Sequence, residues 1–464
     1  MSRLLWNQLK GQLGPFVENA FSSTTTQTAS RVVVDPRTAQ PICNVAEATS
    51  SHVDAAIASA KKAESAWSSQ SGLRRDALFN LAKALERHQD DMAEIEMLQT
   101  GKSRSDASYE VSDTVECFKF FAGYADKLFG QSLSNTVTVR EPYGTVGLVT
   151  SFNYPLMLAG WKLAPALAAG NCVLLKPAPQ TPLTSLALAY LAAPYLPPGV
   201  LSVLPGGTET GQRVIDIVDK ASFTGSTRAG QAIMRRQSDR LLPLVLECGG
   251  KNPAIILKDA DLDATVEHVA LGAFSNAGQN CCAISRVLVH EKIHDEFIQK
   301  LQGYVQQKIQ DFEPLIDEAQ FSRVQSFLTD KQQKPAFTAP NPYTRGYYIP
   351  PTVFTNVKDS HRLATEEIFG PVLSVLEPFS TVDEAIHRTN ASQYGLAAGV
   401  FSRDYKQARR VAQALHTGYV WINMYNIMPP YSPFGGRKLS GVGNDLGQAA
   451  VEEFTFVKTI MADL

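Results

Sequence analysis

The sequence is poor in cysteine, and its few cysteines form no metal-binding pattern. There is no CxxC pair, and no Cys/His spacing is typical of a zinc site. Six cysteines in 464 residues indicate a reducing compartment, where thiols stay free. We therefore expect free thiols and no metal centre. The cysteines are Cys43, Cys117, Cys172, Cys248, Cys281 and Cys282.

Long hydrophobic runs and an excess of one charge are also missing. No apolar run approaches the ~20 residues of a spanning helix, so we expect no membrane segment. The formal net charge of −2 does not favour nucleic acid or an anionic membrane as a partner. The N-terminus lacks a long apolar segment, which argues against a secretory signal. We expect a cytoplasmic protein, with a mitochondrial transit peptide as the alternative because the N-terminus is Ser/Thr-rich and poor in acids.

Helical and strand-like segments occupy different parts of the chain. Alanine and leucine recur at helical spacing from 52 to 103, and a further helix is expected over 113–130. From about Gly144 to Gly250, short strand-like segments alternate with helical ones, which predicts a parallel, doubly wound sheet. The alternation continues beyond Gly250 with different loops. Since this length needs two or three domains, we expect an α/β protein with two sheet domains.

Two adjacent cysteines stand in a small, uncharged segment, "SNAGQNCCAIS" (275–285). A turn that contains Gly278 can hold a thiol at a cleft with backbone N–H groups nearby, as an activated thiolate and an oxyanion site require. Most cysteines, however, are simply small buried residues. The local pattern alone leaves both interpretations open, and it does not decide between Cys281 and Cys282.

Polar residues follow several expected strands. Glu247 ends an apolar run and meets two glycines, a place where a half-buried carboxylate suits a general base; a surface Glu at a turn is the alternative. Asn153 lies between a strand and a helix begun by proline, so its amide is a candidate oxyanion donor. Lys176 follows a strand of the parallel sheet, and such sheets bind ligands at the carboxyl ends of their strands.

Two glycine-containing turns are candidate cofactor contacts. Gly225 and Ser226 lead from a strand into a helix, a geometry that binds phosphate. Gly206 lies in "GGTETG", which departs from the GxGxxG pattern but is expected at a turn near a cofactor.

These segments, in this order, resemble the aldehyde dehydrogenase superfamily. The motifs that carry the resemblance are "FNYP", "PALAAGNCVLLKPA", "FTGST", "LECGGK", "GQNCC", "EEIFGP" and "SPFGGRKLSGVG". The match covers nearly the whole chain, from "VVVDPRTAQPI" to "VKTI". Within the superfamily, the sequence most resembles the betaine-aldehyde and 4-trimethylaminobutyraldehyde (ω-aminoaldehyde) dehydrogenases.

The resemblance implies an α/β aldehyde dehydrogenase fold. A Rossmann-like, parallel-sheet cofactor domain would span 1–130 and 144–249, and a second α/β catalytic domain would span 250–440. A small β flap, 131–143 with 441–464, would bridge subunits of a homodimer or homotetramer. The partner implied at the site is a small-molecule aldehyde.

The resemblance also assigns the reaction. The family pattern Gly-Gln-x-Cys ends here at Cys281, which makes it the nucleophile. Its thiolate would attack the aldehyde carbon, and the amide of Asn153 with the backbone N–H of Cys281 would hold the oxyanion. Hydride transfer to a nicotinamide would leave a thioester, which water activated by Glu247 would hydrolyse to the acid.

The cofactor implied is NAD, with NADP as the alternative. Pro179 stands where many members carry an acid that disfavours a 2′-phosphate. Lys176 is expected on the adenosine ribose. The other expected cofactor contacts are Gly225 and Ser226 at the pyrophosphate, Glu367 at the nicotinamide ribose with Phe369 beside it, and also Thr150, Phe152, Gly206 and Phe223.

Aromatic and acidic residues favour an ω-amino or trimethylamino aldehyde. Aromatic faces with carboxylates suit an ammonium group, and these positions look like those lining the tunnel of betaine-aldehyde and ω-aminoaldehyde dehydrogenases. Core aromatics and a solvated acidic helix are the alternative. The expected substrate contacts are Tyr109, Glu110, Asp113, Tyr154, Trp161 and Phe434.

The sequence leaves three alternative functions open. One is a general aliphatic aldehyde dehydrogenase. A second resolves the thioester with CoA, against which the presence of Glu247 argues. The third is a catalytically impaired scaffold, because the segment between Cys281 and Glu367 is shorter than in most relatives.

Overall fold

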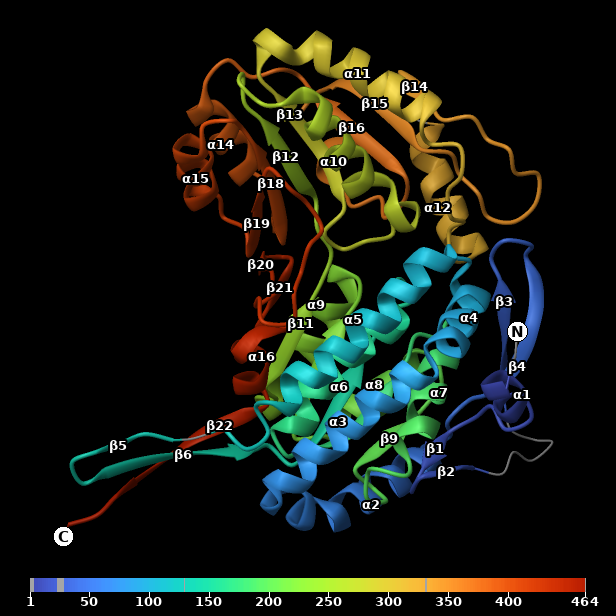
Figure 1. Cartoon of the computed structure of the whole chain (residues 1–464), viewed down its shortest axis with the longest axis vertical. Coiled ribbons are helices and arrows are strands. Elements are labelled where there is room, and N and C mark those ends of the chain that lie inside the picture. The colour runs from blue at the N-terminus through green and yellow to red at the C-terminus, as the bar shows by residue number, and fades with distance from the viewer. Residues whose placement is uncertain (1–3, 23–28, 129, 330–331, 464) are drawn as a thin grey trace.

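A computed structural model describes residues 4–22, 29–128, 130–329 and 332–463. Two α/β units lie one above the other, and a narrow sheet projects from the side of the lower unit (Figure 1). Part of the Ser/Thr-rich N-terminal stretch, on which the transit-peptide alternative depends, lies outside the described residues. Within the described ranges, no helix is both long and apolar enough to cross a bilayer.

The first sheet is the parallel, doubly wound sheet that the sequence predicted. Its parallel strands run in the order β9-β8-β7-β10-β11. Its edges are extended by β1 (Phe16–Val17), β2 (Ala20–Phe21) and β21 (Gly441–Val442). Nearly all residues of these five strands are buried, as expected for a sheet covered on both faces. The strands are β7 (Thr145–Val149), β8 (Cys172–Lys176), β9 (Leu201–Val203), β10 (Lys220–Thr224) and β11 (Leu244–Glu247).

Helices cover both faces of this sheet. On one face lie α6 (Pro155–Ala168), which is buried along its whole length, and α7 (Leu183–Ala192), backed by α3 (Ser71–Arg87), α4 (Gln89–Thr100) and α5 (Arg104–Ala122). On the other face α2 (Ser50–Ser69) packs with α8 (Thr208–Ile217), and α9 (Thr227–Arg236) precedes β11.

The helix expected over 113–130 has different limits. It is α5, which begins nine residues earlier, because the Ser103 hydroxyl accepts a hydrogen bond from the backbone N–H of Asp106 (3.1 Å) and caps the helix. It ends at Ala122, followed by Gly123.

The second sheet has the order β14-β15-β16-β13-β12-β18-β19, with all neighbours parallel except β14 and β15. Its strands are β12 (Asn252–Ile256), β13 (Ile284–Val289), β14 (Phe337–Thr338), β15 (Thr352–Val357), β16 (Val372–Leu376), β18 (Ala397–Phe401) and β19 (Tyr419–Ile422). Its helices are α10 (Leu262–Phe274), α11 (His294–Gln307), α12 (Glu318–Leu328), α14 (Val382–Asn390) and α15 (Tyr405–Ala414).

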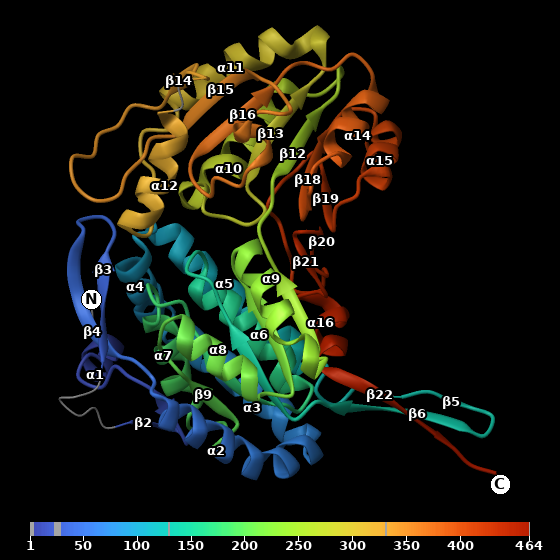
Figure 2. The ribbon, with the colours of Figure 1, turned by 180° about the vertical axis from the view of Figure 1, so that it is seen from behind.

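The two sheets face each other with opposite ends of their strands. The chain leaves the carboxyl end of β11 at Glu247 and starts β12 at Asn252 after a short connection (Figure 2). The carboxyl edge of the first sheet therefore lies opposite the amino edge of the second. Loops that follow strands of the first sheet meet loops that precede strands of the second.

The projecting sheet contains β5 (Ser132–Leu133), β6 (Thr136–Pro142) and β22 (Thr455–Met461), with the C-terminus at its tip (Figures 1 and 2). The preceding β21 (Gly441–Val442) pairs with β11, and α16 (Gly447–Glu453) packs against α6. Of the segment 441–464, only β22 thus joins the projecting sheet.

Candidate active site

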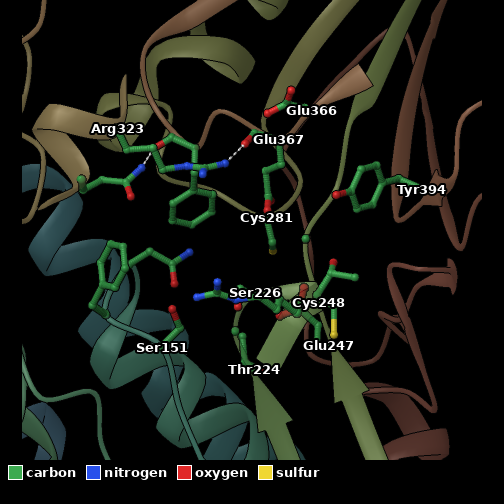
Figure 3. Close-up of a pocket in the computed structure, with 18 of the residues that line it drawn as sticks. Ser151, Thr224, Ser226, Glu247, Cys248, Cys281, Arg323, Glu366, Glu367 and Tyr394 are labelled. Atoms are coloured by element: carbon green, nitrogen blue, oxygen red, sulfur yellow. Dashed lines mark hydrogen bonds between the residues drawn. The ribbon is translucent and has the colours of Figure 1, made fainter. Parts of the chain in front are cut away.

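A cavity of about 510 Å³ opens between the two sheet edges. It brings together side chains that are far apart in the sequence. In Figure 3, Cys281 lies between Glu367 and Glu247. The predicted site residues that line this cavity are Phe152, Asn153, Gly225, Ser226, Glu247, Cys281, Glu367 and Phe369. Thr150, Lys176, Gly206 and Phe223 are not among its lining residues.

The strand order explains why the first sheet contributes two of these loops. It reverses direction between β7 and β10, and at such a point the connecting helices leave on opposite faces and open a crevice. The loop after β7 carries Phe152 and Asn153, and the turn after β10 carries Gly225 and Ser226. The Ser226 hydroxyl caps α9 by accepting from the Ala229 N–H (3.3 Å), which fixes the amino end of the helix at the cavity.

The loop before β13 holds Cys281 in a strained backbone. Asn276 and Ala277 both have φ of 53°, in the left-handed region that side chains disfavour. Side-chain hydrogen bonds hold this loop: the Asn276 amide donates to its own loop at Gln279 O (3.0 Å). The Asn252 amide donates to Cys281 O (2.8 Å), so the nucleophile candidate is anchored to the start of β12.

Glu247 and Cys281 perturb one another. Burial raises the pKa of Glu247 to about 7, although the Lys162 ammonium opposes the shift. Neither carboxylate oxygen of Glu247 has a hydrogen-bond partner among the described residues. The Cys282 thiol, burial and the Glu247 carboxylate raise the pKa of Cys281 well above its usual range. The Cys281 thiol and the Glu247 carboxyl therefore lie close enough for each to affect the ionisation of the other.

The hydrogen bonds that hold Asn153 in place are made by its backbone carbonyl and not by its side chain. Its carbonyl accepts hydrogen bonds from Lys102 Nζ (2.6 Å) and from the Asn276 amide (2.9 Å). The side-chain Oδ1 has no partner within the described ranges. Lys102 also pairs with Glu110 and lies 4.0 Å from the centre of the Tyr154 ring. A buried cation thus fixes the loop that presents the Asn153 amide to the cavity.

This pair corrects the expectation for Glu110. Glu110 and Asp113 were both expected to contact the substrate. Glu110 is instead fully buried and directed to Lys102, because its position on α5 points into the helical layer. Burial raises the pKa of Glu110, with Lys102 opposing. Its place in the structure is beneath the Asn153 loop.

Asp113 lies with aromatic residues on the adjoining part of α5 and α6. Its carboxylate accepts a hydrogen bond from Trp161 Nε1 (2.7 Å), and Trp161 meets Phe434 edge-on at 5.9 Å. Burial raises the pKa of Asp113 to about 6, while the Trp161 bond lowers it. Tyr109 is 53% exposed. Its pKa is raised by burial, with smaller contributions from Asp113 and Cys282.

Glu367 approaches a backbone without side chains. Its Oε1 accepts from the Gly250 N–H (3.0 Å), and a Cβ on Gly249 would lie 2.2 Å from its Oε2. A side chain on Gly249 would displace this carboxylate, so the bare backbone there lets Glu367 approach. Phe369 has φ of 58° and meets Phe152 edge-on at 5.8 Å. Burial raises the pKa of Glu367, against the Gly250 N–H.

Several lining residues were not predicted. Helix α12 holds the Glu367–Phe369 loop: Arg323 donates to Glu367 O (2.5 Å), and the Gln320 amide donates to Phe369 O (2.6 Å). No local signal marked α12, which reads as an ordinary amphipathic helix. The Tyr394 hydroxyl points into the cavity (Figure 3). The missed residues with charged or polar side chains include Arg228, Gln320, Arg323, Gln393 and Tyr394.

A cysteine, a carboxyl group and a side-chain amide line one cavity, and these are the groups that covalent thiol chemistry uses. The chain belongs to the aldehyde dehydrogenase family, whose model matches residues 23–460. It is 40% identical to the mitochondrial aldehyde dehydrogenase of Mesocricetus auratus over 92% of this chain and 90% of that one. The resemblance drawn from the motifs is therefore confirmed at the level of the family.

Solved structures agree along the whole chain. The NAD⁺ complex of an aldehyde dehydrogenase from Bacillus cereus has a TM-score of 0.96 at 34% identity, covering 100% of this chain and 99% of that one. A betaine aldehyde dehydrogenase from Staphylococcus aureus, in complex with NAD⁺, has a TM-score of 0.93 at 34% identity, covering 98% and 95%. The predicted fold class is confirmed.

Proposed function

We propose that this enzyme oxidises an ω-amino or trimethylamino aldehyde to its carboxylic acid with NAD, through a thiohemiacetal and a thioester on Cys281. The observation that carries the chemistry is the convergence of Cys281, Glu247 and Asn153 on one cavity. Steady-state NADH formation at 340 nm on a panel of aldehydes tests it. Equal or better kcat/KM for hexanal and benzaldehyde than for 4-aminobutyraldehyde would leave only a general aldehyde dehydrogenase.

The first step is the attack of Cys281 on the aldehyde carbon. Its thiol must lose a proton, and the neighbouring Glu247 accepts it. The carbonyl oxygen becomes an oxyanion, which accepts hydrogen bonds from the Asn153 amide and from the backbone N–H of Cys281. One such donor stabilises the transition state by about 3 kcal/mol.

The residues present fit a dinucleotide. The turn at Gly225 and the capped amino end of α9 suit a pyrophosphate. A Cβ on Gly225 would lie 2.5 Å from Cζ of the Phe223 ring. Glu367 is positioned for ribose hydroxyls. When bound, NAD accepts the hydride that leaves the thiohemiacetal carbon. The NAD⁺ complex of the B. cereus relative supports this assignment.

Hydrolysis completes the cycle. The thioester carbon on Cys281 is attacked by water, whose proton passes to Glu247, and the acid leaves as the thiolate is restored. A carboxyl with a pKa of about 7 is half ionised near neutral pH, which suits a base that must both take and release protons. Its presence supports hydrolysis over transfer to CoA.

Lys102 is expected to position Asn153. Lys102→Met removes the 2.6 Å bond to Asn153 O, so we expect kcat to fall by about tenfold, within the 10²–10³ that one oxyanion donor contributes. KM is expected to change little. The decisive measurement is a double-mutant cycle: in an Asn153→Ala background, Lys102→Met lowers kcat by less than about twofold. An equal loss in both backgrounds, at a comparable melting temperature, would show that Lys102 does not act through Asn153.

Asp113 and its aromatic neighbours support the proposed substrate class. A carboxylate hydrogen-bonded to an indole and flanked by aromatic faces can bind a cationic head group, which an aliphatic tail does not need. The betaine aldehyde dehydrogenase among the similar structures supports this choice. Glu110 no longer belongs to this group, so the proposal depends on one acid.

Asp113→Asn tests this choice. It should raise KM for 4-aminobutyraldehyde about tenfold and leave KM for hexanal unchanged, because only the cation loses an ionic partner. Above pH 6 Asp113 is ionised and binds the cation; as pH falls through about 6 it is protonated, and KM for the amine rises in the unmodified enzyme. Glu116→Gln on the same helix, paired with Lys119 at the surface, is the control. Parallel changes in both substrates' KM would contradict the assignment.

We also propose roles for the three parts of the fold. The first unit binds the dinucleotide, and the second carries the nucleophile. The projecting sheet joins subunits of a homodimer or homotetramer. Hydrophobic side chains exposed on it support this last role: Leu133, Val137, Phe456, Val457, Ile460 and Met461.

A further inference from the structure

A second cavity, of about 300 Å³, lies in the unit of the second sheet. It is bounded by β13, by α13 (Arg362–Thr365) and by the loop that follows α14 (Figure 1). Of its described lining residues, only Gln393 also lines the catalytic cavity. This volume is far larger than one water molecule needs, so the cavity can hold a ligand of several atoms. Its lining residues are Arg286, Asp359, Ala364, Thr365, Arg388, Ala391, Ser392 and Gln393.

Arg286 is a buried cation in the wall of this cavity. It lies on β13, is 5% exposed, and donates from Nε to Lys251 O (2.9 Å). Neither of its Nη groups makes a hydrogen bond or an ion pair with any described residue. Burial lowers the pKa of Arg286 to about 10, although Asp359 raises it. Buried charges in proteins are normally paired, so these Nη donors are available to an anion that enters the cavity.

A second buried cation lies near Arg286. Lys251 ends the motif "LECGGK", is 1% exposed, and has no hydrogen-bond partner for its Nζ within the described ranges. Lys251 and Arg286 together line a small further pocket. Burial lowers the pKa of Lys251 to about 7, and Arg286 lowers it further, while Glu367 and Glu366 oppose the shift. An anion beside Arg286 would therefore reduce the repulsion between these two cations.

The other charges around the cavity are largely compensated. Arg388 on α14 donates to Asp359 Oδ2 (2.8 Å) and to Glu384 Oε1 (3.3 Å). Lys438, whose pKa is lowered by burial and then by Arg286, donates to two backbone carbonyls. Asp359 is the carboxylate that lines the cavity, and its side chain is 46% exposed. Since Asp359 is engaged by Arg388, the charge of Arg286 remains for a ligand.

We propose that this cavity binds a small oxyanion, a carboxylate or a phosphate, with the guanidinium of Arg286 as its principal ligand. The planar fork of an arginine matches two oxygens of either group. The Ser392 hydroxyl accepts from the Tyr394 N–H (3.2 Å), so its own proton can be donated to a further oxygen. Asp359 limits the affinity by repulsion. The site goes beyond the proposed function, because it is separate from the cavity that contains Cys281.

The test is titration calorimetry of the full chain with inorganic phosphate and, separately, with acetate, at constant ionic strength and with saturating NAD. The wild type is expected to bind at least one of them, and the one that binds more tightly identifies the group. Arg286→Gln is expected to weaken binding by at least about tenfold, because a charge-assisted contact is lost. Asp359→Asn is expected to strengthen binding about threefold, since a repelling charge is removed. A gain of affinity cannot arise from unfolding.

Arg410→Gln is the control, because Arg410 is exposed on α15, pairs with Asp383 and does not line the cavity. Thermal unfolding separates ligand binding from a structural role of Arg286. The anion should raise the Tm of the wild type, because it binds the folded state, and this increment should vanish in Arg286→Gln. An Arg286→Gln variant whose Tm still rises with the anion would overturn the site.

Three further results would also overturn it. These are binding of neither anion, displacement of the anion by NAD, and unchanged affinity in both Arg286→Gln and Asp359→Asn. NAD-linked aldehyde oxidation would stand in each of these cases, because the catalytic cavity does not contain Arg286 or Asp359. Conversely, a chain without aldehyde oxidation that still binds the anion through Arg286 would contradict the proposed function alone.

Discussion

Cys281→Ala is expected to lower aldehyde-dependent NADH formation by at least about 10⁴-fold. Without the thiol no thiohemiacetal forms, so Asn153 and Glu247 have no covalent intermediate to act on. Binding of NAD should be unaffected. The direct measurement is mass spectrometry of enzyme quenched during turnover. It should show the acyl mass on the peptide that contains Cys281.

The adjacent thiol provides the matched control. Cys282 is fully buried, and its Sγ contacts the side-chain oxygens of Asn280 and Asn426 at 3.2 Å. Its sulfur is thus engaged in the loop, whereas Cys281 lines the cavity. Cys282→Ala should keep most of the activity and still become acylated at Cys281. Acylation at Cys282, or full activity of Cys281→Ala, would refute the assignment of the nucleophile.

Glu247→Gln is the second large effect. General-base catalysis contributes about 10²–10⁴ in rate, so kcat should fall by about that factor. If hydrolysis suffers more than attack, one equivalent of NADH should appear rapidly and then stop, with thioester accumulated on Cys281. Rapid-mixing absorbance at 340 nm resolves the burst of NADH. Neutral hydroxylamine should release the acyl group from Cys281 as the hydroxamate.

The pH dependence of this base has a defined sign. Burial raises the pKa of Glu247 to about 7, so the carboxyl is protonated and inactive below that pH and becomes competent as pH rises through it. The wild-type kcat should therefore climb through about pH 7, and Glu247→Gln should lack this limb. Glu366→Gln is the control, since Glu366 lines the same cavity but is exposed. Retention of the limb in Glu247→Gln would assign the titration to another group.

Local patterns predicted those parts of the site that depend on a residue's immediate neighbours. The glycines after Glu247 were interpreted only as a setting for a half-buried carboxylate, and the structure shows that Glu367 also approaches them. The turn at Gly225 was recognisable because a strand, a glycine and a helix follow one another. Glu110 was misplaced because helical spacing tells which residues share a face, and only packing tells which face is buried.

The sequence by itself determined the elements and the candidate side chains. These are two runs of alternating strands and helices, a thiol in a tight turn, and an acid and an amide at strand ends. The tertiary structure decided how these meet. The short connection from β11 to β12 sets the carboxyl edge of one sheet against the amino edge of the other, so that Cys281 and Glu367 precede their strands while Asn153 and Glu247 follow theirs. Such long-range placement depends on how whole layers pack, because no local segment of the chain encodes the orientation of a second sheet.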